Sequence, residues 1–108
     1  MAEWLLLIKN DSLASAQMIA SGSAGADHQQ TMIAAYGGTV TGQWGLLGRF
    51  DVAVIASFPR HEEVAAYCLA VGASGSSVEA IPALAPDAVQ AATEVATRAV
   101  DKLGAGLV

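Results

Sequence analysis

Apolar residues gather in short runs along the chain, and the first run spans residues 4–8. An apolar run of this length without alternation predicts a strand that is buried on both faces, and therefore a central strand. Two later runs are also typical of strands, because residues 39–47 alternate in places and residues 51–58 are rich in valine and isoleucine. Gly48 lies between them and predicts a tight β-hairpin in which the glycine has a positive φ.

Between these strands the apolar residues recur at helical spacing. A helix capped by Asp27 and ending near Tyr36 would turn its apolar side chains toward a sheet, and the two glycines after Tyr36 would end it. A weaker apolar pattern over residues 13–19 predicts a short helix before it. Small residues at 21–25 then predict a flexible break.

The second half of the chain repeats this order. A helix after Pro59 would place one apolar stripe on the sheet, formed by Val64, Cys68 and Val71. Residues 76–84 predict the last strand, and Pro82 within it indicates an edge strand, where a missing amide hydrogen is tolerated. A final helix is expected from about residue 86 to residue 103.

The predicted order is βαββαβ with a C-terminal helix, which gives an α+β, ferredoxin-like fold with a four-stranded antiparallel sheet. The right-handed crossover rule places the first and third strands in the middle. We expect one domain over residues 1–103 and a frayed tail at 104–108. Two helices cover one sheet face, and the other face is expected to be lined by Leu5, Leu7, Thr41, Gln43, Asp51, Ala53, Ile55, Ser57 and Glu79.

Composition changes this picture by requiring a partner. Of the 108 residues, 54% are apolar and only 14% are charged, which is more apolar surface than a small domain can hide within itself. A second copy of the chain is the simplest cover, so a homodimer or higher homo-oligomer is expected. Because two strands are apolar on both faces, the expected assembly joins the uncovered sheet faces.

The charges argue against two classes of partner. The net charge is −5, and the five basic residues are scattered along the chain. Nucleic-acid binding and binding to an anionic membrane surface both need clustered basic residues, so neither is expected. Residues 4–8 are too few to span a bilayer and lack the pattern of a signal peptide, and one cysteine permits no internal disulfide. A cytoplasmic protein is the resulting expectation.

The predicted hairpin carries the clearest pair of charges. Arg49 and Asp51 are two residues apart, so an arginine that binds an anion could stand beside a carboxylate that orients a ligand or accepts a proton. An adjacent arginine lowers the pKa of a carboxylate, so the pair suits ligand binding better than proton abstraction. The alternative is turn chemistry, in which Asp51 accepts backbone hydrogens and Arg49 pairs locally or across an interface.

Other candidates are single residues. His28 and His61 join Asp51 as candidate general bases, although histidines at helix ends are more often simply solvated. Trp44, Tyr36 and Gln43 are candidates to contact a ligand, with the two aromatic rings as pocket walls, while aromatic residues more often fill a core. The histidines lack ligand spacing and Cys68 is isolated on an apolar stripe, so no metal and no cofactor are expected.

Three segments resemble the GYD domain family. They are Tyr36-Gly37-Gly38-Thr39-Val40, the strand entrance beginning Gly48-Arg49-Phe50-Asp51, and residues 68–79. The namesake pattern is a glycine, an aromatic residue and an aspartate, and here Phe50 stands for the tyrosine. The resemblance covers roughly residues 1–87 and implies a dimeric α/β-barrel arrangement, in which two sheets pack face to face.

Two functions from different classes fit these observations. One is a cofactor-free domain that binds or transforms a small, largely apolar organic molecule between the sheet and its partner. The other is a non-enzymatic assembly protein whose sheet face is a protein–protein interface. The fold does not choose between them, and the sequence leaves open whether the chain is an enzyme.

Overall fold

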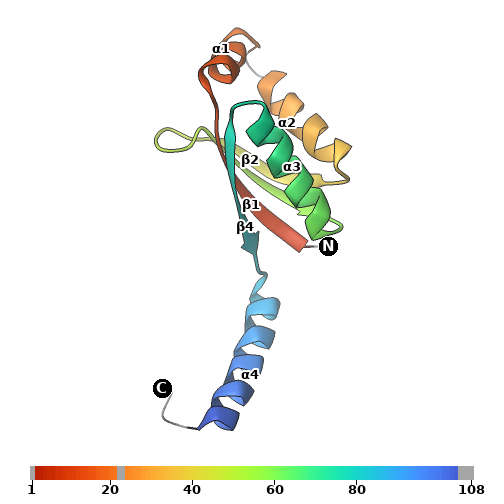
Figure 1. Ribbon diagram of the computed structural model, residues 1–108, viewed down its shortest axis with the longest axis vertical. Helices are drawn as coiled ribbons and strands as arrows, with labels where there is room; N and C mark the ends of the chain where they lie inside the picture. The colour runs from red at the N-terminus through yellow and green to blue at the C-terminus, as the bar shows by residue number, and fades with distance from the viewer. Residues whose placement is uncertain (1, 22–23, 105–108) are drawn as a thin grey trace.

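The computed structural model describes residues 2–21 and 24–104, and it has the predicted α+β fold. Strands β1 (Ala2–Lys9), β2 (Thr39–Gly45), β3 (Val52–Phe58) and β4 (Ser77–Ala83) form one antiparallel sheet in the order β2-β3-β1-β4 (Figure 1). The predicted central positions of β1 and β3 are confirmed. The predicted edge position of the strand that contains Pro82 is confirmed as well.

Four helices complete the fold over residues 2–21 and 24–104. Helices α2 (Ala24–Ala35) and α3 (His61–Ala73) lie on the same face of the sheet, while α1 (Ser12–Ser21) joins β1 to α2. Helix α4 (Pro86–Leu103) follows β4. Because α2 begins at Ala24, Asp27 lies in its first turn and not at the predicted capping position. The predicted break at 21–25 lies partly outside the described residues, as does all of the predicted frayed tail beyond Gly104.

The hydrophobic core lies between the sheet and helices α2 and α3. Alternate strand residues point into it, since Leu6 of β1 pairs with Val54 of β3 and Ile8 pairs with Val52. Gly38 permits the chain to enter β2 close to this core, because a Cβ at that position would come within 2.7 Å of the Phe58 ring. A side chain at this position would force Phe58 to shift, which gives one glycine of the Tyr36–Val40 segment a packing role.

Tyr67 is the largest fully buried side chain, and the predicted stripe on its helix omitted it. Val64, Tyr67 and Val71 are the buried residues of α3, whereas Cys68 is only half-buried at the edge of the core. The Tyr67 hydroxyl donates a hydrogen bond of 2.7 Å to Oε1 of Gln29 in α2. Burial raises the pKa of Tyr67 because the ionised form would lose its hydration.

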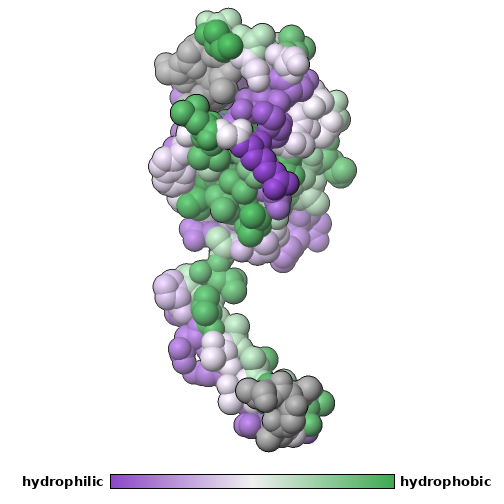
Figure 2. Space-filling model, turned by 90° about the vertical axis from the view of Figure 1, so that its left-hand side faces the viewer, coloured by the Kyte–Doolittle hydropathy of each residue, from purple (hydrophilic) through white to green (hydrophobic). Residues whose placement is uncertain are grey.

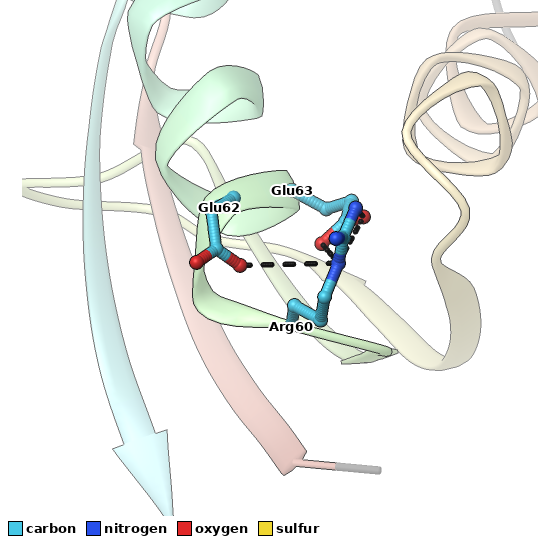
Figure 3. A network of polar contacts seen from close by, with 3 residues as sticks. All are labelled: Arg60, Glu62 and Glu63. Carbon is cyan, nitrogen blue, oxygen red and sulfur yellow. Dashed lines mark hydrogen bonds and ion pairs between the residues drawn. The ribbon is translucent and has the colours of Figure 1, made fainter.

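The first turn of α3 carries a small network of exposed charges. Arg60 caps the helix through its backbone position, and its guanidinium donates to the Glu63 carboxylate at 2.6 Å (Figure 3). Glu62 lies on the other side of the same guanidinium at 3.9 Å. The hydrogen bond from Arg60 lowers the pKa of Glu63, and both acids also suit the positive end of the helix dipole.

Helix α4 extends away from the rest of the domain and gives the molecule its long axis of 59 Å (Figure 1). No side chain of α4 is buried in the described part of the chain. Figure 2 shows apolar residues, in green, gathered over one side of the domain body and continuing along the upper part of α4. The fold therefore leaves two apolar surfaces exposed, one on the sheet and one on α4.

Candidate functional site

The sheet face that the helices do not cover is the first candidate site. We call it the open face, and its apolar centre consists of Leu5, Leu7, Trp44, Ala53, Ile55 and Ile81. Polar residues border this centre at both ends of the strands and along edge strand β4, where Glu79 pairs with Leu7. Lys9 and Asp51 lie at one end, and Glu3 pairs with Ser57 at the other. Such a surface combines a wide apolar area with a few polar groups, which is the usual composition of a ligand site.

A β-bulge decides which residues of β2 belong to the open face. The pairing of β2 with β3 shifts between Val40 and Gly42, so Thr41 is an extra residue whose hydroxyl bonds to the Ile55 carbonyl oxygen. Beyond the bulge the alternation is reversed, as β-bulges require. Trp44 therefore pairs with Ala53 on the open face, and its ring lies over Gly42. Its side chain is 53% exposed.

The bulge also corrects the predicted position of Gln43. Gln43 pairs with Val54 and therefore points to the helix-covered face. Its Oε1 is buried and has no hydrogen-bond partner among the described residues. Gln43 and Trp44 lie on opposite faces of the sheet, so they cannot contact one ligand as predicted.

Tyr36 also lies on the helix-covered side. Its ring meets the Tyr67 ring edge to face, with 6.2 Å between the centroids, and it packs against the core. The predicted grouping of Tyr36 with Trp44 as two walls of one pocket is therefore wrong. Of the two predicted aromatic walls, only Trp44 faces the possible partner.

Asp51 is held by four contacts at the entrance to β3. Its carboxylate accepts a hydrogen bond of 2.8 Å from the Asn10 amide and lies 3.4 Å from the Lys9 ammonium. Its backbone amide donates to the Ile8 carbonyl, and its own carbonyl accepts from the Leu46 amide, both at 2.8 Å. This is the turn chemistry that was the alternative to a ligand role.

Arg49 does not pair with Asp51 in the described contacts. Its guanidinium lies over the Phe50 ring at 5.5 Å, in the exposed loop that joins β2 to β3. The predicted positive φ of Gly48 is confirmed at 148°. The loop thus presents Arg49 at the same end of the open face as Lys9 and Asp51. Its guanidinium stacks on the Phe50 ring and is not paired with the Asp51 carboxylate.

Lys9 is the site residue that the sequence prediction missed. The first and third strands were expected to be neighbours, and antiparallel pairing of Ile8 with Val52 places residues 9 and 51 opposite each other. Opposite charges on such cross-strand neighbours attract. The signal was therefore present in the sequence once the register of the two strands was considered.

The two histidines lie far apart in the sequence and on different helices. His28 is exposed on α2, and His61 is the first residue of α3. The His61 ring meets the Trp4 ring edge to face at 5.6 Å. Both rings border an open cleft of about 490 Å³ at the ends of β1 and β4, together with Glu3, Ser57, Pro82, Ala83, Leu84, Ala85 and Ala88.

The remaining chemistry of the described residues is limited. Burial raises the pKa of the Cys68 thiol, which leaves less of the reactive thiolate at neutral pH. No three His, Cys, Asp or Glu side chains within residues 2–21 and 24–104 are grouped so that they could hold a metal ion. Among the helices of those same residues, none combines the length and the apolar character needed to cross a membrane.

Comparison with known proteins gives one match. Residues 5–93 match the family described as GYD domain, a span that runs from β1 into the first half of α4. The chain matches no curated protein and no solved structure. The match includes the hairpin entrance and the Tyr36–Val40 segment whose glycine packs on Phe58. With most of its length matched, this chain belongs to the GYD domain family.

Proposed function

We propose that this GYD domain protein is a homo-oligomer whose open face meets a second copy and there binds a small, largely apolar organic molecule. The observation that carries the proposal is Trp44, a large aromatic side chain that is 53% exposed on edge strand β2, beside the apolar residues of β3 on the open face. Exposed aromatic residues within an apolar patch mark binding surfaces. The β-bulge at Thr41 is what turns Trp44 toward this surface.

The two-sided apolar character of the central strands supports the presence of a second copy. Leu5 and Leu7 of β1 are only half-covered on the open face, beside Ala53 and Ile55 of β3. Leaving such residues against water forgoes part of the free energy of burial. The polar borders of the face would leave room for water and a ligand between two copies, in agreement with the arrangement that the family resemblance implies.

The chemistry of the site favours a flat apolar molecule that carries an anionic oxygen. Trp44 offers a ring face for stacking, and Arg49 offers planar donors at the hairpin end of the open face. Lys9 already compensates Asp51. No reaction is assigned, because the Asp51 carboxylate is engaged by Lys9 and the Asn10 amide and so is poorly placed to accept a proton.

The first experiment tests the partner with two matched substitutions. Leu7→Glu places a charge on the open face, whereas Leu69→Glu places the same charge on the outer side of α3, where the leucine is 75% exposed. We expect Leu7→Glu to lower the weight-average mass in sedimentation at micromolar concentration, and Leu69→Glu to leave it unchanged. A wild-type chain that sediments as a folded monomer would contradict the proposal.

The second experiment uses the two tryptophans as paired reporters. Trp44 lies on the open face, and Trp4 lies on the helix-covered side. With 1-naphthoate as the probe, we expect saturable quenching that persists in Trp4→Phe and is lost in Trp44→Ala. Arg49→Ala should weaken binding of the naphthoate more than that of uncharged naphthalene. Equal binding by all variants would remove the open face as the ligand site.

The alternative function is assembly without a ligand, and one observation favours it. The Asp51 carboxylate already has protein partners, and the other carboxylates of the open face, Glu3 and Glu79, are exposed at its borders, so few polar groups converge on the apolar centre. The open face would then serve only to join two copies through a filled, dry interface. Failure of every aromatic probe to bind an intact oligomer would favour this reading.

A further inference from the structure

The cleft of about 490 Å³ lies at the end of the sheet that is opposite to the hairpin loop. Strand β1 begins and β4 ends here, and β4 leads directly into α4 (Figure 1). Its lining residues come from β1, β3, β4, α3 and the first turn of α4. A cleft of this volume suits a small organic molecule.

The two sides of this cleft differ in chemistry. On the helix-covered side the Trp4 ring meets the His61 ring at 5.6 Å, and Pro82 pairs with Trp4 and extends the apolar wall. On the other side Glu3 stands opposite Ser57 of the neighbouring strand. Directly paired residues have Cβ atoms about 5 Å apart. The cleft therefore places a carboxylate and a hydroxyl beside an aromatic wall.

Glu3 is the charged residue of this lining. In the described part of the chain no ion pair engages its carboxylate, in contrast with Asp51, which lies 3.4 Å from the Lys9 ammonium. A carboxylate only accepts hydrogen bonds, and the Ser57 hydroxyl and the neutral imidazole of His61 can accept as well. Three acceptors in one cleft match a ligand group that carries several donors.

The basic residue nearest to the cleft in the sequence is already compensated. Arg60 precedes His61, but its guanidinium lies between the Glu62 and Glu63 carboxylates (Figure 3). The start of α3 therefore adds more negative than positive charge beside the cleft.

The other basic residues lie too far away to compensate Glu3. Lys9 follows it by six residues along β1, or about 20 Å at 3.3 Å per residue, and Arg49 lies at that same far end. Arg98 is the first basic residue of α4 and follows Ala88 of the cleft by ten residues, or about 15 Å. The cleft therefore favours a cation over an anion.

We propose that this cleft binds a small primary ammonium compound with an apolar body. The ammonium group lies against Glu3 and Ser57, because its three donors match their acceptors. The apolar body lies against Trp4, whose ring also attracts cations. This site lies at the end of the sheet away from Arg49, and its ligand has the opposite charge to the molecule proposed for the open face.

Trp4 can report binding in a chain that lacks the other tryptophan. The protein has two tryptophans, so Trp44→Ala leaves Trp4 as the single one and also removes the ring of the open face. With 2-phenylethylammonium as the probe at low ionic strength, we expect a saturable change in Trp4 emission. Uncharged 2-phenylethanol should bind about threefold to tenfold more weakly, and anionic 3-phenylpropanoate more weakly still.

A matched pair of charge removals locates the ammonium group. Glu3→Gln and Glu79→Gln each remove one exposed carboxylate from the same sheet face, but Glu79 pairs with Leu7 and so lies about 13 Å further along the strands. We expect Glu3→Gln to weaken binding of 2-phenylethylammonium about threefold to tenfold and Glu79→Gln to leave it unchanged. Circular dichroism and sedimentation confirm that each variant keeps its fold and assembly.

A charge introduced from α4 provides a test with a gain of binding. Ala88→Arg places a guanidinium in the cleft, whereas Gln90→Arg places it on α4 outside the cleft lining. Both substitutions suit a helix. We expect Ala88→Arg to reverse the preference, so that 3-phenylpropanoate binds more tightly than 2-phenylethylammonium, and Gln90→Arg to leave the preference unchanged.

Three results would overturn the proposal. No saturable change in Trp4 emission would mean that the cleft does not bind the ammonium probe. Similar affinities for the ammonium, the alcohol and the carboxylate would mean that charge plays no part. Equal losses in Glu3→Gln and Glu79→Gln would mean that the probe responds to the net charge of the protein. The open-face proposal fails separately, because its own tests depend on Leu7, Trp44 and Arg49.

Discussion

Helix α3 lacks a clear polar side but packs on the sheet, whereas helix α4 has a clear polar side but packs on nothing in the described structure. Helix α3 has apolar residues all around it: Tyr67 is fully buried against the sheet, while Leu69, two residues later, is 75% exposed. Helix α4 has its apolar residues on one side only, yet none of its side chains is buried in the described structure. The comparison shows that clean amphipathicity indicates a missing partner, whereas burial depends on where the chain places a helix relative to the sheet.

The largest expected effect lies within α3 and separates its two sides. Tyr67→Ala removes the largest side chain of the core and leaves a cavity, which should lower the free energy of unfolding by about 3–5 kcal/mol, as for other buried aromatic residues. Leu69→Ala on the solvent side should change it by less than about 0.5 kcal/mol. Urea unfolding at a fixed protein concentration measures both. Similar losses in the two variants would mean that the outer side of α3 is covered in the assembly.

A matched valine pair then compares the two helices directly. Val64 of α3 is 4% exposed and Val89 of α4 is 49% exposed. Val64→Ala should cost about 2 kcal/mol in the free energy of unfolding, from the lost burial of two methyl groups. In dilute protein, where copies separate, Val89→Ala should cost less than about 0.5 kcal/mol. If the cost of Val89→Ala rises with protein concentration, the residue is buried between copies.

A smaller effect concerns the polar contact that fixes α3 to α2. Tyr67→Phe removes the hydroxyl that donates to Gln29 and should cost about 1 kcal/mol in the free energy of unfolding. Burial raises the Tyr67 pKa in the folded state, so the folded protein holds this proton more tightly than the unfolded chain. The protonated Tyr67 therefore contributes its full stabilisation of the fold below pH 10, the ordinary pKa of tyrosine. This stabilisation is lost as the pH rises from there through the raised pKa of the folded state.

Urea midpoints between pH 9 and pH 11 measure this dependence. The wild-type midpoint should fall with rising pH, and the slope should be shallower in Tyr67→Phe. Tyr36 is the matched control, because its ring packs edge to face with Tyr67 but is only half-buried. Equal slopes in wild type and Tyr67→Phe would show that Tyr67 ionises as freely in the folded state as in the unfolded chain.

The smallest effect is expected at the exposed beginning of α3. Arg60→Ala removes the hydrogen bond that lowers the Glu63 pKa. Because Glu63 has a depressed pKa in the folded state, its ion pair with Arg60 stabilises the fold above the ordinary pKa of glutamate. This stabilisation is lost as the pH falls through the lowered pKa of the folded state. We expect a slight loss of stability at pH 7 that disappears in acid and in high salt, since both groups are solvated. A salt-independent loss would indicate a backbone effect at the cap.

The errors of the sequence prediction have local physical causes. Val64, Cys68 and Val71 do follow helical spacing, but the buried side of α3 is centred on Tyr67. Because α3 is apolar in every direction, its sequence allows more than one such stripe and does not show which one faces the sheet. Gln43 was placed on the open face by strict alternation, which the bulge at Thr41 reverses. A bulge depends on how two distant strands register with each other. It leaves no reliable mark in one strand alone.

The sequence by itself determined the order of the elements, the central β1 and β3, the edge position of β4 and the positive φ of Gly48. These features follow from local apolar patterns, proline and glycine, whose preferences act within a few residues of the chain. Only the tertiary structure decided that Trp44 faces outward, that Lys9 holds Asp51, and that α4 lies apart from the sheet. Each of these depends on the register or placement of segments far apart in the sequence, and that is fixed by the packing of the whole core.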